Sequence, residues 1–358
     1  MRDRTPLDDD RLTAAFDVVG RQVADGRARH AALAVARGDG LVRAESWGPG
    51  GTLREPARFL TASITKPITA TAVLQLVEDG VLVLSEPLRT YLPDFEPEPW
   101  QPGAPGGEAI TTWHILNHTS GLGDLGEAYL DSHRPSALDV SAWVRRSRLA
   151  FAPGSQHRYA SDSWYLLAEL VERVGGLPFA EHLRKRIFGP LGMAATTFDP
   201  LEPGPAPLPL GGYFERYGIL LEVATRYFVS LGMPGGGLWS TADDLVRFGR
   251  AILGRGRLEG TRILGRPFVD FMTRDHTENV LEAGDPPRRP NYGLGWVRYG
   301  ASRNLPVGPS AVGHAGATGG SLTIDPDNDL VVVYLRNEWG APDAPNLEAI
   351  QAVFAALD

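Results

Sequence analysis

The chain has 358 residues, 43% of them hydrophobic, which is enough for one large domain or two that pack closely together. Its formal net charge is −8, so it has no surplus of basic residues with which to bind nucleic acid or an anionic membrane. It contains no cysteine, which excludes disulfides, thiolate catalysis, iron–sulfur clusters and cysteine-ligated zinc.

The N-terminal part of the sequence predicts a helix, a β-hairpin and a second helix. Residues 11–25 carry apolar side chains at helical spacing. Two β-prone runs within 31–47 flank a Gly-Asp-Gly turn, which is typical of a hairpin. The second helix is predicted from about Ser63 to Glu78, with Gly80 as its stop signal.

The rest of the chain predicts helices first and strands later. Short helical patterns broken by glycine and proline fill 109–165, and proline-rich loops interrupt the chain at 200–212 and 284–290. The longer elements expected in this part of the chain are an amphipathic helix over 163–175, strands over 293–299, 321–325 and 330–336, and a closing helix over 346–356.

This order of elements predicts an α/β fold of the α+β kind. We expect an antiparallel sheet that is flanked by helices and built from both chain ends, with a mostly helical inserted domain. Residues 1–80 and 290–358 are expected to form the sheet domain, and residues 81–289 the insertion that lines the active site. No apolar run is long enough to span a bilayer and no secretory signal is visible, so we expect a cytoplasmic protein without a membrane partner.

Lysine is rare in this chain, which draws attention to the two positions that have it. Of 35 basic residues, only Lys66 and Lys185 are lysines. Arginine keeps its proton at ordinary pH, whereas a buried lysine can release it, so a retained lysine is a candidate for acid–base chemistry. Lys185 lies in a basic helical stretch, and we interpret it as solvated surface.

Ser63 lies three residues before Lys66, which places both side chains on one face of the predicted helix. Pro67 is tolerated only in the first helical turn, so it locates the pair at the positive end of the helix dipole. A serine nucleophile needs a base within hydrogen-bond reach, and Ser-x-x-Lys spacing supplies one. The alternative interpretation is an ordinary helix start with a solvated lysine.

Two later segments have side chains or backbone groups that such a nucleophile would use. The hydroxyl of Tyr159 can move a proton between nucleophile and leaving group, although a lone tyrosine is more often a core aromatic. The glycine-rich segment 313–320 precedes a predicted strand, where a backbone N–H can complete an oxyanion hole with the N–H of Ser63. Its alternative interpretation is a glycine-rich hairpin turn.

Taken together, the chain contains Ser63-x-x-Lys66, then Tyr159-x-Ser161, then His314-Ala315-Gly316. In order and spacing these motifs resemble the serine β-lactamase and penicillin-binding-protein superfamily, in particular class C β-lactamases and family VIII carboxylesterases. The similarity extends over about residues 10–357. The flanking segments that agree are His118-Thr119-Ser120-Gly121-Leu122, Gly235-Gly236-Gly237-Leu238-Trp239-Ser240-Thr241, Tyr292-Gly293-Leu294-Gly295-Trp296 and residues 324–331.

The resemblance implies a role for each motif. Ser63 would be the acylated nucleophile, Lys66 its base and Tyr159 the general acid and base. The N–H groups of Ser63 and Ala317 would form the oxyanion hole, with Gly316 beside them in the substrate site.

Two positions depart from the pattern of the superfamily. Ser161 replaces an asparagine that orients a substrate amide, and a hydroxyl reaches less far. His314 replaces a lysine and carries at most a partial positive charge at pH 7, because its ordinary pKa is about 6.5. The change at His314 favours neutral esters or amides over β-lactams and D-alanyl peptides, which carry a carboxylate.

We therefore expect a serine hydrolase that acts on a small-molecule or peptide acyl substrate, without a cofactor, a metal or nucleic acid. An acyltransferase or peptide cyclase would use the same acyl-enzyme and stays open as an alternative. A β-lactamase or D-amino-acid peptidase, and an inactive relative that only binds ligands, are further alternatives.

Motifs of three other functional classes are incomplete or absent in this sequence. Residues 121–126 match Gly-x-Gly-x-x-Gly but lack the preceding strand of a dinucleotide site. His114 and His118 have helical spacing but lack the glutamate and the third ligand of a zinc site. The chain also has no Gly-x-Ser-x-Gly nucleophile elbow.

Overall fold

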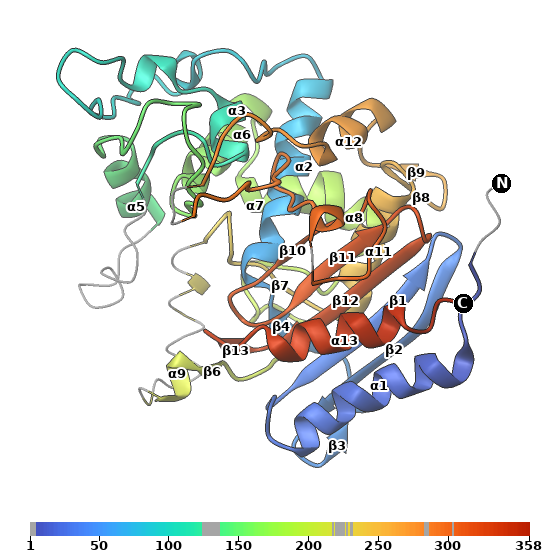
Figure 1. The fold of residues 1–358 in the computed structure, drawn as a ribbon. Helices are drawn as coiled ribbons and strands as arrows, with labels where there is room; N and C mark the ends of the chain where they lie inside the picture. Colours follow the sequence, from blue (N-terminus) through green and yellow to red (C-terminus); the bar gives the residue numbers. More distant parts are fainter. Residues whose placement is uncertain are drawn as a thin grey trace.

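A computed structural model shows the chain as a central antiparallel sheet with helices on both faces (Figure 1). It describes residues 5–123, 137–216, 218, 226, 228–229, 232–282, 286–302 and 304–358. The sheet has six strands in the order β10-β11-β12-β1-β2-β3, and each neighbouring pair is antiparallel. Its strands are β1 (Ala31–Arg37), β2 (Gly40–Gly48), β3 (Gly51–Thr52), β10 (Val312–Ala315), β11 (Ser321–Asp325) and β12 (Leu330–Arg336).

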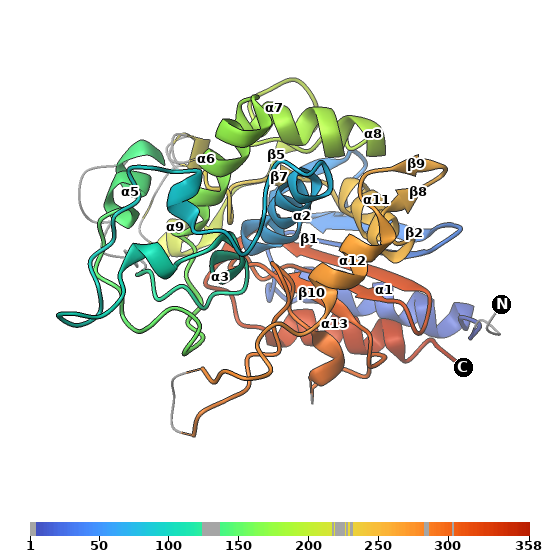
Figure 2. The same cartoon turned by 90° about the horizontal axis from the view of Figure 1, so that it is seen from above.

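Both chain ends contribute to this sheet, as the sequence predicts. Strand β12, near the C-terminus, pairs along its length with β1, near the N-terminus. Helices α1 (Asp9–Ala24) and α13 (Ala344–Phe354) pack against each other on one face, and α11 (Ala242–Leu253) covers the other (Figures 1 and 2). The two termini also meet, because the Asp8 N–H donates to the Ala356 carbonyl at 2.8 Å.

The alternation of side chains in β1 explains why the sheet needs cover on both faces. Leu33 and Val35 pack into the hydrophobic core formed with α1 and α13. Ala34 and Ala36 point the other way, into the larger core beneath α11. Every residue of β1 is buried, so a sheet with one open face would expose apolar surface to water.

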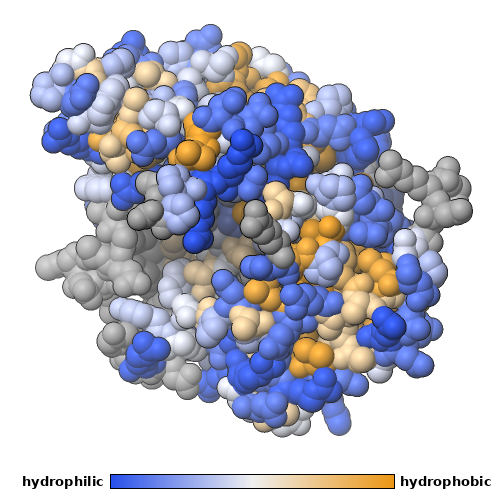
Figure 3. Space-filling view, in the orientation of Figure 1, coloured by the Kyte–Doolittle hydropathy of each residue, from blue (hydrophilic) through white to orange (hydrophobic). Residues whose placement is uncertain are grey.

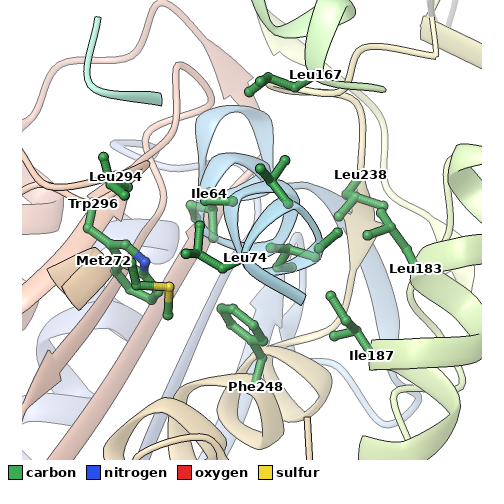
Figure 4. Packing of buried hydrophobic residues seen from close by; sticks show 14 of the residues in the cluster. Ile64, Leu74, Leu167, Leu183, Ile187, Leu238, Phe248, Met272, Leu294 and Trp296 are labelled. Atoms are coloured by element: carbon green, nitrogen blue, oxygen red, sulfur yellow. The ribbon is translucent and has the colours of Figure 1, made fainter. Parts of the chain in front are cut away.

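Helix α2 (Thr65–Glu78) lies in the middle of the molecule, and a single 3₁₀ turn, η1 (Ala62–Ile64), precedes it. Twelve of its 14 residues are buried, which explains why its sequence shows little amphipathic pattern. Apolar side chains from many elements surround it (Figure 4). Besides Leu74 of α2 itself, Figure 4 labels Ile64, Leu167, Leu183, Ile187, Leu238, Phe248, Met272, Leu294 and Trp296.

The remaining elements are short and lie mostly in the middle of the chain. The helices and helical turns are η2 (Leu88–Thr90), η3 (Gly107–Ala109), α3 (Thr112–Leu116), α5 (Ala137–Val144), α6 (Trp164–Gly175), α7 (Phe179–Leu183), η4 (Arg184–Phe188), α8 (Gly189–Leu191), α9 (Tyr213–Arg216), α12 (Arg266–Thr273) and η5 (Tyr299–Ala301). The short strands are β4 (Ala57–Leu60), β5 (Ala206–Pro207), β6 (Gly211–Gly212), β7 (Trp239–Ser240), β8 (Arg257–Leu258), β9 (Thr261–Arg262) and β13 (Glu338–Trp339).

One predicted strand is wrong. Residues 293–299 form no regular strand: Gly295 adopts φ +75°, and the Gly293 N–H bonds back to the Trp296 carbonyl at 2.7 Å. The tight turn leaves only isolated pairs, one of which joins Val297 to Gly313. The edge strand of the sheet is instead β10, which the sequence did not predict as a strand.

The proposed division at residues 80 and 290 stays a prediction. Two elements of the middle segment contact the two ends closely: α11 packs on the sheet, and β7 pairs with β4. Among the described residues, no helix is both long and apolar enough to cross a membrane. The face seen in Figure 3 shows hydrophilic side chains interspersed with smaller hydrophobic patches.

Candidate active site

Ser63 lies in η1, at the N-terminal end of α2. Hydrogen bonds hold the chain just before it: both the N–H and the hydroxyl of Thr61 donate to the Leu238 carbonyl at 2.8 Å. The next residue, Ala62, adopts φ +45°, a conformation that costs free energy in a residue with a side chain. Strain of this kind persists where the surrounding structure holds it, and here it lies directly before Ser63.

Lys66 is fully buried, and its amine has three oxygen acceptors. The Nζ atom lies 3.3 Å from Ser63 Oγ, 3.1 Å from Ser161 Oγ and 2.8 Å from the Gly235 carbonyl oxygen. These acceptors account for the three N–H bonds of an ammonium group. Among the described residues, no carboxylate forms an ion pair with Lys66.

Tyr159 reaches the same serine from a segment 96 residues further along the chain. Its hydroxyl donates to Ser63 Oγ at 2.9 Å, and its ring lies 4.8 Å from Lys66 Nζ. The side chain is 37% exposed, so the phenol lies at the boundary between the buried amine and solvent. The structure therefore brings the predicted hydroxyl, amine and phenol into one hydrogen-bonded group.

Gly235 borders the amine of Lys66, a function that the sequence did not assign to it. A Cβ atom added at Gly235 would lie 3.1 Å from Lys66 Nζ and 3.3 Å from the side chain of Trp164. The ring of Trp164 lies on another side of the amine, 5.4 Å away. Glycine is needed here because the backbone that accepts the lysine hydrogen bond also passes very close to the lysine.

His314 lies near the other three groups but is bonded to a different partner. Its Nδ1 is 2.8 Å from the Ala315 carbonyl, an acceptor, so Nδ1 carries the proton. Its Nε2 then accepts from the hydroxyl of Tyr292, also at 2.8 Å. Burial, with a smaller effect from Lys66, lowers the pKa of His314 to about 3, so the ring is neutral at pH 7.

The segment after His314 packs against the backbone that leads to Ser63. A Cβ atom at Gly316 would lie 2.4 Å from the Thr61 carbonyl oxygen, so only glycine allows this approach. Thr318 donates its hydroxyl to the Leu60 carbonyl at 3.0 Å, which holds the segment there. Ala317, between them, is exposed, and among the described residues its N–H has no backbone acceptor.

His118 is a buried neighbour of the site that the sequence interpretation left without a role. Its ring centroid lies 4.4 Å from that of Tyr159, and its Nδ1 accepts from the Ala160 N–H at 3.2 Å. The Nδ1 of His114 instead accepts from the Thr111 N–H, so the two histidines do not converge on one point. Within the described ranges, no cluster of three or more possible ligands could hold a metal.

The sequence offers only one indication that Tyr292 and His118 belong to the site, namely the segments in which they occur. Tyr292 begins the Tyr-Gly-Leu-Gly-Trp segment and His118 begins His-Thr-Ser-Gly-Leu, both noted as flanking similarities. Neither segment has a spacing that predicts chemistry by itself. Of the Gly-x-Gly-x-x-Gly pattern set aside earlier, residues 124–126 lie outside the described residues.

The β-lactamase family model matches residues 16–356, and the chain belongs to this family. Esterase EstB from Burkholderia gladioli is 31% identical over 346 residues, covering 87% of this chain and 84% of EstB. Solved structures with the same fold include a family VIII carboxylesterase (TM-score 0.74, 20% identity, 98% and 99% coverage). Another is EstCE1, described as a hydrolase with promiscuous acyltransferase activity (TM-score 0.76, 20% identity, 97% and 99% coverage). These relatives are hydrolases with the serine β-lactamase fold, as the motif resemblance implied.

Proposed function

We propose that this protein is a serine hydrolase of the esterase-like kind, which cleaves an ester or amide through an acyl-enzyme on Ser63. The observation that carries the proposal is the position of Ser63 Oγ, 3.3 Å from Lys66 Nζ and 2.9 Å from the Tyr159 hydroxyl. A serine hydroxyl is a weak nucleophile until a neighbouring base takes its proton. The Tyr159 hydroxyl lies within the distance over which a proton is transferred, and the Lys66 amine lies at its outer limit.

In the first half-reaction, Ser63 Oγ bonds to the carbonyl carbon while its proton passes to Lys66, which can accept it only in the amine form. The charge that develops on the carbonyl oxygen is stabilised by the N–H groups of Ser63 and Ala317. Tyr159 gives its proton to the leaving oxygen or nitrogen as that bond breaks, and takes a proton back from Lys66. In the second half-reaction, water attacks the acyl-enzyme, the protons move in reverse, and Ser63 is regenerated.

The neutral state of His314 supports uncharged substrates. A carboxylate gains most from a cation that faces it, and the superfamily resemblance places a lysine at this position. His314 has a pKa of about 3 and donates its one N–H to the Ala315 carbonyl, so it offers no positive charge. The name of EstB, a family relative, agrees with ester substrates.

Transfer of the acyl group to an alcohol or amine is a second candidate. Tyr159 is 37% exposed beside Ser63, so a second substrate can approach the acyl-enzyme from solvent in place of water. The printed description of EstCE1, which shares the fold, includes such an activity. Incubation with p-nitrophenyl butyrate and a series of alcohols, followed by product analysis, tests it: new butyrate esters support transfer, and butyrate alone excludes it.

The main test compares the wild type with Ser63→Ala on p-nitrophenyl butyrate. We expect kcat to fall by about 10⁴-fold or more, because the acyl-enzyme cannot form. A fluorophosphonate probe should label the wild type on Ser63 and leave the variant unlabelled. Ser155→Ala is the matched control, because Ser155 is exposed and, within the part of the chain that the structure describes, its hydroxyl bonds only to the nearby Ala152 carbonyl. Full activity in Ser63→Ala would show that the nucleophile is wrong.

A further inference from the structure

The phenol of Tyr159 depends on its surroundings for its position. It is 37% exposed, and among the described residues its hydroxyl makes one hydrogen bond, to Ser63. An exposed tyrosine with a single hydroxyl contact would ordinarily sample several rotamers. A residue that restricts the ring would therefore control how often the phenol lies within reach of the serine.

The imidazole of His118 lies beneath this ring. The two centroids are 4.4 Å apart with an interplanar angle of 36°, a close aromatic contact. His118 itself is 2% exposed, and the rings of Trp164, Tyr292 and His157 lie 5.7, 5.0 and 5.8 Å from it. Packing against this buried aromatic cluster restricts the ring of His118, and the ring of His118 in turn restricts the exposed ring of Tyr159.

The backbone of His118 and its side chain hold the peptide groups on both sides of Tyr159. The His118 carbonyl accepts from the Arg158 N–H at 2.9 Å, and Nδ1 accepts from the Ala160 N–H at 3.2 Å. These bonds locate the backbone of Tyr159, while the ring contact restricts its side chain. One residue therefore makes three separate contacts with a three-residue segment.

His118 makes these contacts in an unusual backbone conformation. Its φ is +59°, in the left-handed region that L-residues other than asparagine, aspartate and histidine seldom adopt. This conformation costs free energy and persists where the surrounding structure requires it. The ring must also be neutral, since Nδ1 uses its lone pair to accept from Ala160. Burial, followed by Lys66, lowers the pKa of His118 well below its ordinary value.

We infer that His118 is a positioning residue, which holds the hydroxyl of Tyr159 within hydrogen-bond distance of Ser63 through its ring and its two backbone bonds. It acts through Tyr159 and does not itself exchange protons with the substrate. This inference, which rests on the proposed function, predicts that His118 affects the rate of acylation more than the binding of substrate.

The test uses two substitutions of the full-length protein. His118→Ala removes both the ring and the acceptor. His118→Asn keeps an acceptor, Oδ1, near the position of Nδ1 and tolerates positive φ, but removes the ring. His276→Ala is the control: His276 is a half-buried histidine, bonded to Trp113 and Phe271 rather than to the Tyr159 segment.

Steady-state hydrolysis of p-nitrophenyl butyrate is measured for each protein, with kcat expressed per site labelled by the fluorophosphonate probe. This normalisation separates a slower active site from a smaller folded fraction. We expect His118→Ala to lower kcat about 100-fold and to change KM less than about threefold, since a misplacement near 1 Å costs about this much. His118→Asn should have a kcat of roughly a tenth of the wild-type value or more. If the alanine variant does not fold, the asparagine variant alone still tests the inference.

Three results would overturn the inference. They are a kcat per labelled site in both variants within threefold of the wild type, a loss that lies mainly in KM, and a His276→Ala control that is equally slow. If Ser63→Ala is inactive while the His118 variants are fully active, only this inference fails. If the wild type neither hydrolyses the ester nor reacts with the probe, the proposed function fails and the inference with it.

Discussion

Replacing Gly235 with alanine should slow acylation through Lys66. A Cβ atom at this position would lie 3.1 Å from Lys66 Nζ, closer than nonbonded carbon and nitrogen normally approach. The new methyl group cannot move away from the amine on the side of Trp164, because it would lie 3.3 Å from the Cβ and Cγ atoms of Trp164. The amine must therefore move by a few tenths of an ångström.

The expected magnitude follows from the geometry of the amine. Lys66 Nζ is already 3.3 Å from Ser63 Oγ, so a shift of this size lengthens that hydrogen bond beyond its useful range. Since misplacement by 1 Å costs about 100-fold, we expect a shift of a few tenths of an ångström to lower kcat/KM by about 5- to 10-fold, or ~1 to 1.4 kcal/mol of transition-state stabilisation. Overpacking should lower the free energy of unfolding by only about 1 kcal/mol.

The neighbouring glycine provides a matched control. A Cβ atom at Gly236 would lie 3.7 Å from the Met233 methyl group and 3.8 Å from the Ala62 backbone, which are ordinary contacts. We expect Gly236→Ala to keep its kcat/KM within about threefold of the wild type. Hydrolysis of p-nitrophenyl butyrate and urea unfolding are measured for both variants. Wild-type kinetics in Gly235→Ala, or equal losses in both variants, would refute this account of the lysine.

Two other substitutions test charge in the interior and in the site. His182 is 1% exposed, and burial lowers its pKa to about 4. Between this value and about 6.5 only the unfolded chain binds the proton, so the free energy of unfolding decreases as the pH is lowered through this range. In urea unfolding, His182→Leu should therefore gain ~2 kcal/mol relative to the wild type on going from pH 8 to pH 5; identical pH dependence of the two proteins would contradict this. His314→Lys should raise kcat/KM for benzylpenicillin about 10-fold or more relative to p-nitrophenyl butyrate, because a charge-assisted hydrogen bond to the carboxylate becomes available. An unchanged ratio would show that residue 314 does not select substrate charge.

Local patterns in the sequence were enough to predict most of the elements that make the sheet. The strands β11 and β12 have the predicted bounds, and α13 begins two residues before its prediction. Their apolar runs are bounded by turn residues, so the pattern alone indicates them. The segment 293–299 failed this test because its β-prone residues alternate with glycines that turn the chain, which periodicity does not reveal.

The chemical groups of the site can be identified from the residue order alone: a rare lysine three residues after a serine, a tyrosine, and a histidine where the superfamily resemblance places a lysine. Their arrangement in space depends on the packing of distant segments, which brings Tyr159 to Ser63 and Gly235 to Lys66. The charge of His314 likewise depends on the fold, because burial lowers its pKa. The contacts of His118 depend on a left-handed backbone conformation, which no sequence pattern predicts. Spacing along a helix can be read from the chain, whereas burial and long-range packing exist only in the folded protein.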